Sequence, residues 1–249
     1  MENSSYVALS LATVMRRSMD VAANNMANAN TAGFKGERVV FDSYLHKGDA
    51  GEDNGAHFVL DRGSYLDSTQ GSIQHTGNPL DVALQGEGWF SYLTPDGQQA
   101  FGRDGRFSVD AQGNLVTQSG ARVLDAGGQP VAIPPEAAAD LVISGDGTMS
   151  TPDGGALGQL GVFEVPDLQS YERVGGGLFI PPGGGAPVEA PLPDRATQVV
   201  QFSVEGSNVQ PIVEMTRMMA IQKSYERAVN LMTTGDDLRK DALKRLGQA

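Results

Sequence analysis

The sequence contains no cysteine and only three histidines, His46, His57 and His75, among its 249 residues. Without thiols, disulfide bonds and thiolate-bound metals are excluded. The scarcity of imidazole leaves little room for histidine-based catalysis or zinc binding. Phosphate-binding loops, nucleophile elbows and the metal-binding motifs of zinc proteases and calcium loops are also missing. We therefore predict no catalytic residues, no cofactor and no metal site.

Long apolar runs are absent too. No stretch approaches the ~20 residues that a membrane-spanning helix needs, so we expect no membrane insertion. The start of the chain lacks a basic n-region, and Arg16 and Arg17 interrupt its apolar run, so we expect no cleaved signal peptide.

Basic residues are outnumbered, with 18 Lys and Arg against 30 Asp and Glu, which gives a net charge of -12. This balance argues against nucleic acid as a partner, because phosphate binding needs clustered positive charge. Residues 1–40 carry four basic and three acidic side chains, and residues 205–249 carry seven and six. The excess negative charge therefore lies in the central residues 41–204, and both ends of the chain are nearly neutral.

Glycine and proline are absent from the first 32 residues. Residues 4–29 place apolar side chains at steps of three and four, which predicts an amphipathic helix. We expect Gly33, just after this helix, to supply a positive φ where the chain turns away.

Residues 208–232 repeat the helical pattern near the other end. Pro211 is tolerated in a first turn, and Ser207 or Asn208 is expected to cap the helix. Gly235 is expected to break or bend it.

Both helices are apolar around much of their circumference, more than a single contact within one chain would bury. They are also rich in methionine, a flexible side chain that suits surfaces with several different neighbours. We therefore predict a coiled-coil-like helical pair whose faces contact other subunits. The predicted interface residues are Val7, Leu11, Val14, Met15, Met19, Val21, Asn25, Asn28, Met215, Met218, Gln222, Tyr225, Val229 and Met232.

The centre of the chain alternates short β-prone runs with turn sequences at the 8–12-residue spacing of antiparallel sheets. We predict an α+β fold with a central antiparallel β-sandwich or barrel. The predicted domains are a terminal helical assembly domain (1–33 and 207–249), an extended or β connecting segment (34–75) and a glycine-rich β domain (76–206). The strand-forming runs are 80–84, 89–93, 106–109, 114–117, 122–124, 141–144, 160–165, 178–180 and 197–204.

Three motifs carry a resemblance to a known family. Residues 22–35 (AANNMANANTAGFK) resemble the N-terminal signature of flagellar axial proteins, the rod and hook family. Residues 207–211 (SNVQP) and 218–226 (MMAIQKSYE) are similar to the family's C-terminal signature. Between them, the run 77–90 (GNPLDVALQGEGWF) resembles its β-domain motif, as do RDGRF at 103–107 and GNLVT at 113–117.

The resemblance implies a structural subunit and not an enzyme. It would polymerise through its terminal helices into the rod of the flagellar basal body, the drive shaft that transmits torque to the hook and filament. The opening residues 1–10 and the length favour a proximal-rod member, with a distal-rod or hook-type axial protein as the alternative.

The expected partners are other copies of the chain, other proximal and distal rod proteins and the flagellar type III export apparatus. The expected location is the periplasm-spanning rod. Asn25 and Asn28 continue the packed face of the first helix, where a buried amide can fix the register between subunits. A second class stays open, a secreted glycine-rich β protein that binds or cleaves an envelope glycan.

Overall fold

The computed structural model describes residues 2–46, 56–184 and 191–247. The chain divides into two compact units. The helix–hairpin unit contains residues 1–27, 37–67 and 210–249, and the β-rich unit contains residues 28–36 and 68–209. The chain therefore crosses between the units four times, after residues 27, 36, 67 and 209.

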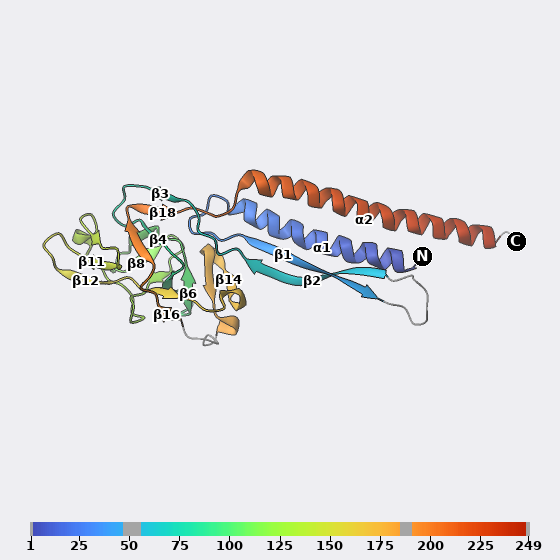
Figure 1. The fold of residues 1–249 in the computed structure, drawn as a ribbon. Helices are drawn as coiled ribbons and strands as arrows, with labels where there is room; N and C mark the ends of the chain where they lie inside the picture. Colours follow the sequence, from blue (N-terminus) through green and yellow to red (C-terminus); the bar gives the residue numbers. More distant parts are fainter. Residues whose placement is uncertain (1, 47–55, 185–190, 248–249) are drawn as a thin grey trace. The chain divides into compact units, whose positions relative to one another are not determined.

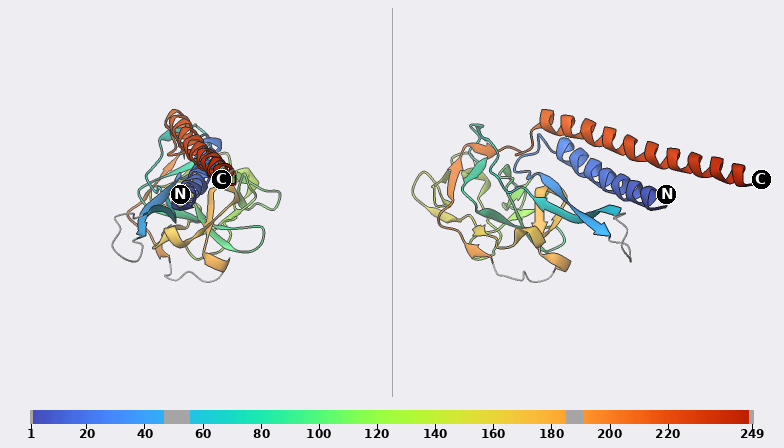
Figure 2. Two further views of the ribbon diagram at one scale, coloured as in Figure 1. Left: turned by 90° about the vertical axis from the view of Figure 1, so that its right-hand side faces the viewer. Right: turned by 45° about the vertical axis from the view of Figure 1, so that its right-hand side comes forward.

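The helix–hairpin unit contains two long helices, α1 (Glu2–Ala27) and α2 (Pro211–Leu246), and two strands, β1 (Glu37–His46) and β2 (Ala56–Leu66). The strands pair antiparallel, and α1 lies between this hairpin and α2 (Figure 1). Within the unit, α2 is longer than α1 and continues past its N-terminal end (Figure 2).

The two helices differ in how much of their surface is covered. The buried face of α1 is built mostly from small side chains, including Ala8, Ala12 and Ala22, which allow close approach. Among the described side chains of α2, only Glu214 and Ala228 are buried. Within this unit, α1 is the covered helix and α2 the exposed one.

Two details of α2 differ from the prediction. Gly235 neither breaks nor ends the helix, which continues to Leu246. A glycine inside a helix costs only about 1 kcal/mol relative to alanine, which a helix of 36 residues can tolerate. The N-cap is Gln210, with no side-chain cap hydrogen bond, so the predicted Ser207 or Asn208 cap was wrong. Pro211 is the first helical residue, as predicted.

The β-rich unit consists of antiparallel strands in several sheets (Figure 1). The largest has nine strands and follows the order β14-β15-β6-β5-β9-β8-β7, with β13 pairing with both β5 and β16. Smaller sheets are β10-β11-β12, β17-β4 and β18-β3. The strands are β3 (Ile73–His75), β4 (Val82–Gln85), β5 (Trp89–Leu93), β6 (Gln99–Gly102), β7 (Phe107–Val109), β8 (Leu115–Thr117), β9 (Arg122–Val123), β10 (Val142–Ile143), β11 (Thr148–Ser150), β12 (Ala156–Gln159), β13 (Val162–Glu164), β14 (Glu172–Val174), β15 (Leu178–Ile180), β16 (Leu192–Pro193), β17 (Gln198–Gln201) and β18 (Ser203–Glu205).

Strand β5 lies at the centre of this unit and is buried from Trp89 to Tyr92. Phe90 packs edge-on against Phe107, with ring centroids 5.4 Å apart. The turns between strands use aspartate, in keeping with the turn chemistry of the sequence. The Asp110 carboxylate, for example, accepts hydrogen bonds from the backbone N–H groups of Gln112 and Asn114 at 2.9 and 2.8 Å.

The predicted run 197–204 is two strands and not one. Phe202 has a φ of 60° and lies between β17, which pairs with β4, and β18, which pairs with β3. The left-handed residue turns the chain from one sheet to the next. At the level of class, the prediction is confirmed: helix and strand are mixed, and the central region is rich in β-structure. The sandwich or barrel closure and the coiled-coil pairing stay predictions.

Gly33 offers a direct test of the packing in the β-rich unit. Its φ is 64°, and a Cβ atom there would lie 2.3 Å from the carbonyl carbon of Arg103. We expect Gly33→Ala to lower the free energy of unfolding by roughly 3 kcal/mol, of which ~1–2 kcal/mol is the left-handed backbone. Denaturant unfolding measures this loss. Gly97 has a φ of 80°, and a Cβ atom there would have no neighbour within 4 Å, so Gly97→Ala should lose the backbone part alone. Equal losses would contradict the close contact at Gly33.

Candidate assembly site

The predicted interface residues do not share one environment. On α1, Val14 and Asn25 are buried, while Val7, Leu11, Met15, Met19 and Val21 are half-buried. On α2, Met218, Val229 and Met232 are half-buried, while Met215, Gln222 and Tyr225 are exposed. Asn28 lies beyond the end of α1, in the β-rich unit, and is half-buried.

Several exposed apolar residues of α2 were missed by the prediction. They are spread along the helix, and the exposed fractions of Ile212 and Leu246 reach 81% and 76%. The sequence could have identified them, because the predicted helix is apolar around more of its surface than the one row of residues chosen as the interface. The missed residues are Ile212, Val213, Met219, Leu231, Leu238, Leu243 and Leu246.

Both the nitrogen and the oxygen of the Asn25 side-chain amide make a hydrogen bond within the helix–hairpin unit. Its side-chain N–H donates to the carbonyl oxygen of Glu37 at 2.8 Å, and its carbonyl oxygen accepts from the Glu37 N–H at 3.0 Å. The amide therefore pairs with both backbone groups of the first residue of β1 and fixes the hairpin to the end of α1. The predicted role of Asn25 in the register between subunits stays a prediction.

A buried carboxylate organises the β-rich unit. Glu205 is 0% exposed, and its Oε1 accepts from the Lys35 ammonium at 2.6 Å and from the Gly71 N–H at 2.9 Å. Its Oε2 accepts from Arg103 at 3.1 Å. Burying three charges is unfavourable unless each is paired and hydrogen-bonded, and here each cation makes a further hydrogen bond to a backbone carbonyl. Lys35 donates to the Thr69 carbonyl at 2.8 Å, and Arg103 donates to the Gly86 carbonyl at 2.7 Å.

The second cation of this group has an aromatic partner. The Arg103 guanidinium carbon lies 5.0 Å from the ring centroid of Trp89, whose π face favours positive charge. Burial lowers the pKa of Arg103, while the charge and hydrogen bond of Glu205 act in the opposite direction. Arginine stays charged because its ordinary pKa is so high. Glu205 is therefore balanced by two positive charges within the interior.

Asn208 extends this network through its amide. Its side-chain carbonyl oxygen accepts from the Gly36 N–H at 2.7 Å, and its side-chain N–H donates to the Thr69 carbonyl at 3.1 Å. Its backbone N–H donates to the Phe34 carbonyl at 3.2 Å. These contacts explain why Asn208 does not cap α2. We name Lys35, Thr69, Arg103, Glu205 and Asn208 the Glu205 clamp.

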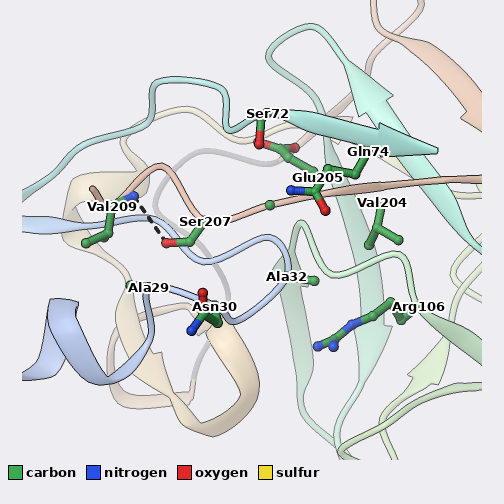
Figure 3. Close-up of a pocket in the computed structure, with 11 residues that line it drawn as sticks. Ala29, Asn30, Ala32, Ser72, Gln74, Arg106, Val204, Glu205, Ser207 and Val209 are labelled. Atoms are coloured by element: carbon green, nitrogen blue, oxygen red, sulfur yellow. Dashed lines mark hydrogen bonds between the residues drawn. The ribbon is translucent and has the colours of Figure 1, made fainter. Parts of the chain in front are cut away.

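A polar pocket of about 390 Å³ lies beside the clamp within the β-rich unit. Figure 3 shows Arg106, Asn30 and Ser207 among its lining residues. Arg106 is held by Asp104, with two N–O distances of 3.0 Å. Ser207 accepts a hydrogen bond from the Val209 N–H at 3.2 Å (Figure 3). The groups that line the pocket therefore stabilise turns and strand ends, and they include no nucleophile paired with a base.

Metal ligands are not grouped in the part of the chain that the structure describes, where no set of three or more His, Cys, Asp or Glu residues could hold an ion. The described helices also include none that is both long and apolar enough to cross a membrane.

Comparison with known proteins matches both ends and the middle of the chain to flagellar families. Residues 6–35 match the flagella basal body rod protein family. Residues 83–151 match the D1 domain of the flagellar hook protein FlgE/F/G family, and residues 200–245 match the C-terminal region of the flagellar basal body rod FlgEFG proteins.

Full-length relatives give the same result. The flagellar basal-body rod protein FlgF of Caulobacter vibrioides is 36% identical over 252 residues, which cover 100% of this chain and 99% of the relative. The chain belongs to the flagellar basal-body rod protein family. FlgF of Mesorhizobium japonicum is also 36% identical, with 99% of each chain covered. The rod protein FlgG of Agrobacterium fabrum is 33% identical, covering 92% of this chain and 93% of that protein.

Membership of this family makes the chain a structural subunit of the flagellar rod, most like FlgF, and not an enzyme. The resemblance found in the sequence motifs is therefore confirmed. The alternative of a secreted protein that binds or cleaves an envelope glycan is not supported, because relatives of the rod family cover the whole chain.

The pairing of Asn25 with β1 can be tested by substitution. We expect Asn25→Ala to lower the free energy of unfolding by roughly 2–4 kcal/mol, because it leaves the N–H and C=O groups of Glu37 without partners. Asn25→Asp should also destabilise the protein, because a carboxylate cannot donate to the Glu37 carbonyl. Thermal unfolding followed by circular dichroism measures both effects. Asn230, which is exposed on α2, supplies the control, and Asn230→Ala should change stability by less than about 0.5 kcal/mol. A similarly small effect of Asn25→Ala would rule out the pairing as a stabilising contact.

Proposed function

We propose that the chain polymerises through the exposed apolar surfaces of its terminal helices to build the proximal rod of the flagellar basal body. The observation that carries this proposal is the uncovered apolar surface of α2, which includes Leu231, Leu238, Leu243 and Leu246. Large exposed apolar surfaces on soluble chains mark sites of protein association. Burying them against neighbouring subunits would stabilise the polymer by the hydrophobic effect.

The assembly contacts would involve both helices, with different contributions. Half-buried Met15 and Met19 on α1, and exposed Met215 and Tyr225 on α2, present flexible or amphipathic side chains to neighbours. The spacing of apolar residues by three and four supports coiled-coil-like packing between helices. The half-buried Asn28 and the exposed Gln222 would add polar contacts that fix the register. The Val14 side chain would support α1 from within the chain.

The assembly domain would comprise the predicted terminal segments 1–33 and 207–249. The β1–β2 hairpin, which falls in the predicted connecting segment 34–75, groups with the helices and would take part in the same assembly. The central β domain, predicted as residues 76–206, would form the acidic body of each subunit.

The proposed partners are further copies of this chain and the other proximal and distal rod proteins. The flagellar type III export apparatus would deliver the chain, without a cleaved signal peptide, to the periplasm-spanning rod. There the polymer would act as the drive shaft that transmits torque to the hook and filament. The proximal position is supported by full-length identity to proteins named FlgF.

The distal rod is the second candidate. Its support is the 33% identity to the FlgG rod protein of Agrobacterium fabrum over 92% of this chain. The identity to FlgF of Caulobacter vibrioides is higher, at 36% over 100% of the chain, and favours the proximal position. Immunogold labelling of isolated basal bodies, scored for position along the rod, would distinguish the two candidates.

Charge introduced on the exposed face of α2 tests the assembly surface. We expect Leu231→Glu combined with Leu238→Glu to abolish incorporation into the rod, because two carboxylates would have to be buried at the contact. The unfolding free energy of the free subunit should change by less than about 1 kcal/mol, since both side chains are already exposed. Swimming and recovery in basal bodies, in a strain that lacks the wild-type chain, give the readout.

Val142 provides the matched control for this pair. It is an exposed apolar residue of the β-rich unit, and Val142→Glu makes the same chemical change away from α2. We expect this variant to incorporate and to support swimming. Normal incorporation of the Leu231 and Leu238 variant would refute the proposed role of α2.

A further inference from the structure

The position of the Glu205 clamp along the chain is its most informative feature. The chain leaves or enters the β-rich unit after residues 27, 36, 67 and 209. Lys35 and Thr69 lie within two residues of the second and third crossings, and Asn208 lies within two residues of the fourth. The clamp therefore gathers three crossings of the chain around one buried carboxylate.

The segment that follows the first crossing is also bonded to Glu205. The segment 28–36 follows it, and the Gly33 N–H donates to the backbone carbonyl of Glu205 at 2.8 Å. Phe34, next in the chain, is buried, and the guanidinium carbon of Arg173 lies 4.5 Å from its ring centroid. Arg173 also donates to the carbonyl oxygen of Lys35. Residues from the N-terminal side are thus part of the interior of the β-rich unit.

The segment that precedes α2 is bound as closely within the β-rich unit. The Gly206 N–H donates to the Ser72 carbonyl at 2.8 Å, and a Cβ atom at Gly71 would lie 2.0 Å from the carbonyl oxygen of Gly206. Two backbone segments therefore touch directly beside the buried carboxylate. Release of the segment at Gly71 would take a backbone donor from Glu205 while the carboxylate is still buried. Release of the segment at Gly206, which carries Glu205, would leave Lys35 and Arg103 without their carboxylate. Both losses are strongly unfavourable.

We propose that the Glu205 clamp holds residues 33–36, 69–72 and 205–208 in the β-rich unit of the unassembled subunit. In the free chain, the β-rich unit is then ordered up to the residues where the chain leaves it. The helix α2 buries few side chains, so its amides become protected from hydrogen exchange only on assembly. The part about assembly rests on the proposed function. The part about the clamp concerns the free subunit alone. The sequence motifs GFK at 33–35 and SNV at 207–209 would accordingly serve an intrachain role.

Hydrogen exchange on the full-length free subunit tests this assignment directly. We expect the N–H groups of Gly33, Gly36, Gly71 and Asn208 to exchange at least roughly 100-fold more slowly than the same residues in an unstructured peptide. Rates at Gly33 and Asn208 equal to those of an unstructured peptide would overturn the proposal.

Removal of the central charge gives the second test. Glu205→Gln keeps the shape of the side chain but leaves Lys35 and Arg103 facing a neutral amide. We expect exchange at Gly33, Gly36 and Gly71 to accelerate at least ~10-fold, while the hydrogen-bonded amides of Leu124 and Val131 keep their rates. No acceleration at the three glycines would refute the clamp. Glu214→Gln is the matched control, since Glu214 is buried and ion-paired in the helix–hairpin unit, and it should leave all three rates unchanged.

A milder variant covers the case in which Glu205→Gln does not fold. Asn208→Ala removes the contacts to Gly36 and Thr69 but keeps all three charges, so exchange at Gly36 should accelerate while Gly71 stays protected. An unchanged rate at Gly36 would count against the clamp.

Exchange in isolated basal bodies separates this proposal from the assembly proposal. Slow exchange in α2 of the free subunit, with no gain on assembly, would refute assembly through α2 and leave the clamp intact. Fast exchange at Gly33 and Asn208 in the free subunit, with α2 protected on assembly, would refute the clamp alone.

Discussion

The structure of the β-rich unit depends on keeping one buried carboxylate satisfied. A carboxylate in the protein interior is stable only when charged and polar donors surround it, and Glu205 obtains them from three distant parts of the sequence. Lys35 comes from the N-terminal motif, Arg103 from the centre and Gly71 from the segment that follows the hairpin. The fold must bring these segments together before the charge can be buried. Residues 33–36 and 205–208 are therefore held in the β-rich unit by electrostatics as well as by apolar packing.

The two long helices differ in how much of their apolar surface the chain covers. A folded domain normally covers its apolar surface within the chain, and α1 largely follows this rule. On α2, leucines such as Leu231 and Leu238 lie exposed in the single chain. Such a surface is a liability in an isolated protein and a source of free energy in a polymer. Rod proteins assemble with one another, and the contact proposed above would cover this surface of α2.

The excess of acidic residues on the surface of the β-rich unit has two separate causes. Many of its carboxylates, such as Asp110 and Asp125, close tight turns by accepting backbone N–H groups, which is a local structural use of aspartate. Two of its few basic residues, Lys35 and Arg103, are consumed in the interior by Glu205. The exposed surface of the β-rich unit is left with an excess of acid.

The sequence by itself determined the features that depend on local chemistry. Helical periodicity located α1 and α2, turn residues located β5 and most of its neighbours, and the motifs at 22–35 and 207–211 identified the family. Only the tertiary structure decided what the polar motif residues contact. Asn208 was expected to cap α2 but pairs with Gly36 and Thr69, and Asn25 pairs with Glu37. Glu205, Lys35 and Arg103 stand far apart in the chain, and periodicity carries no information about such long-range partners. Their pairing is set by the energy of burying charge, which exists only once the whole unit has folded.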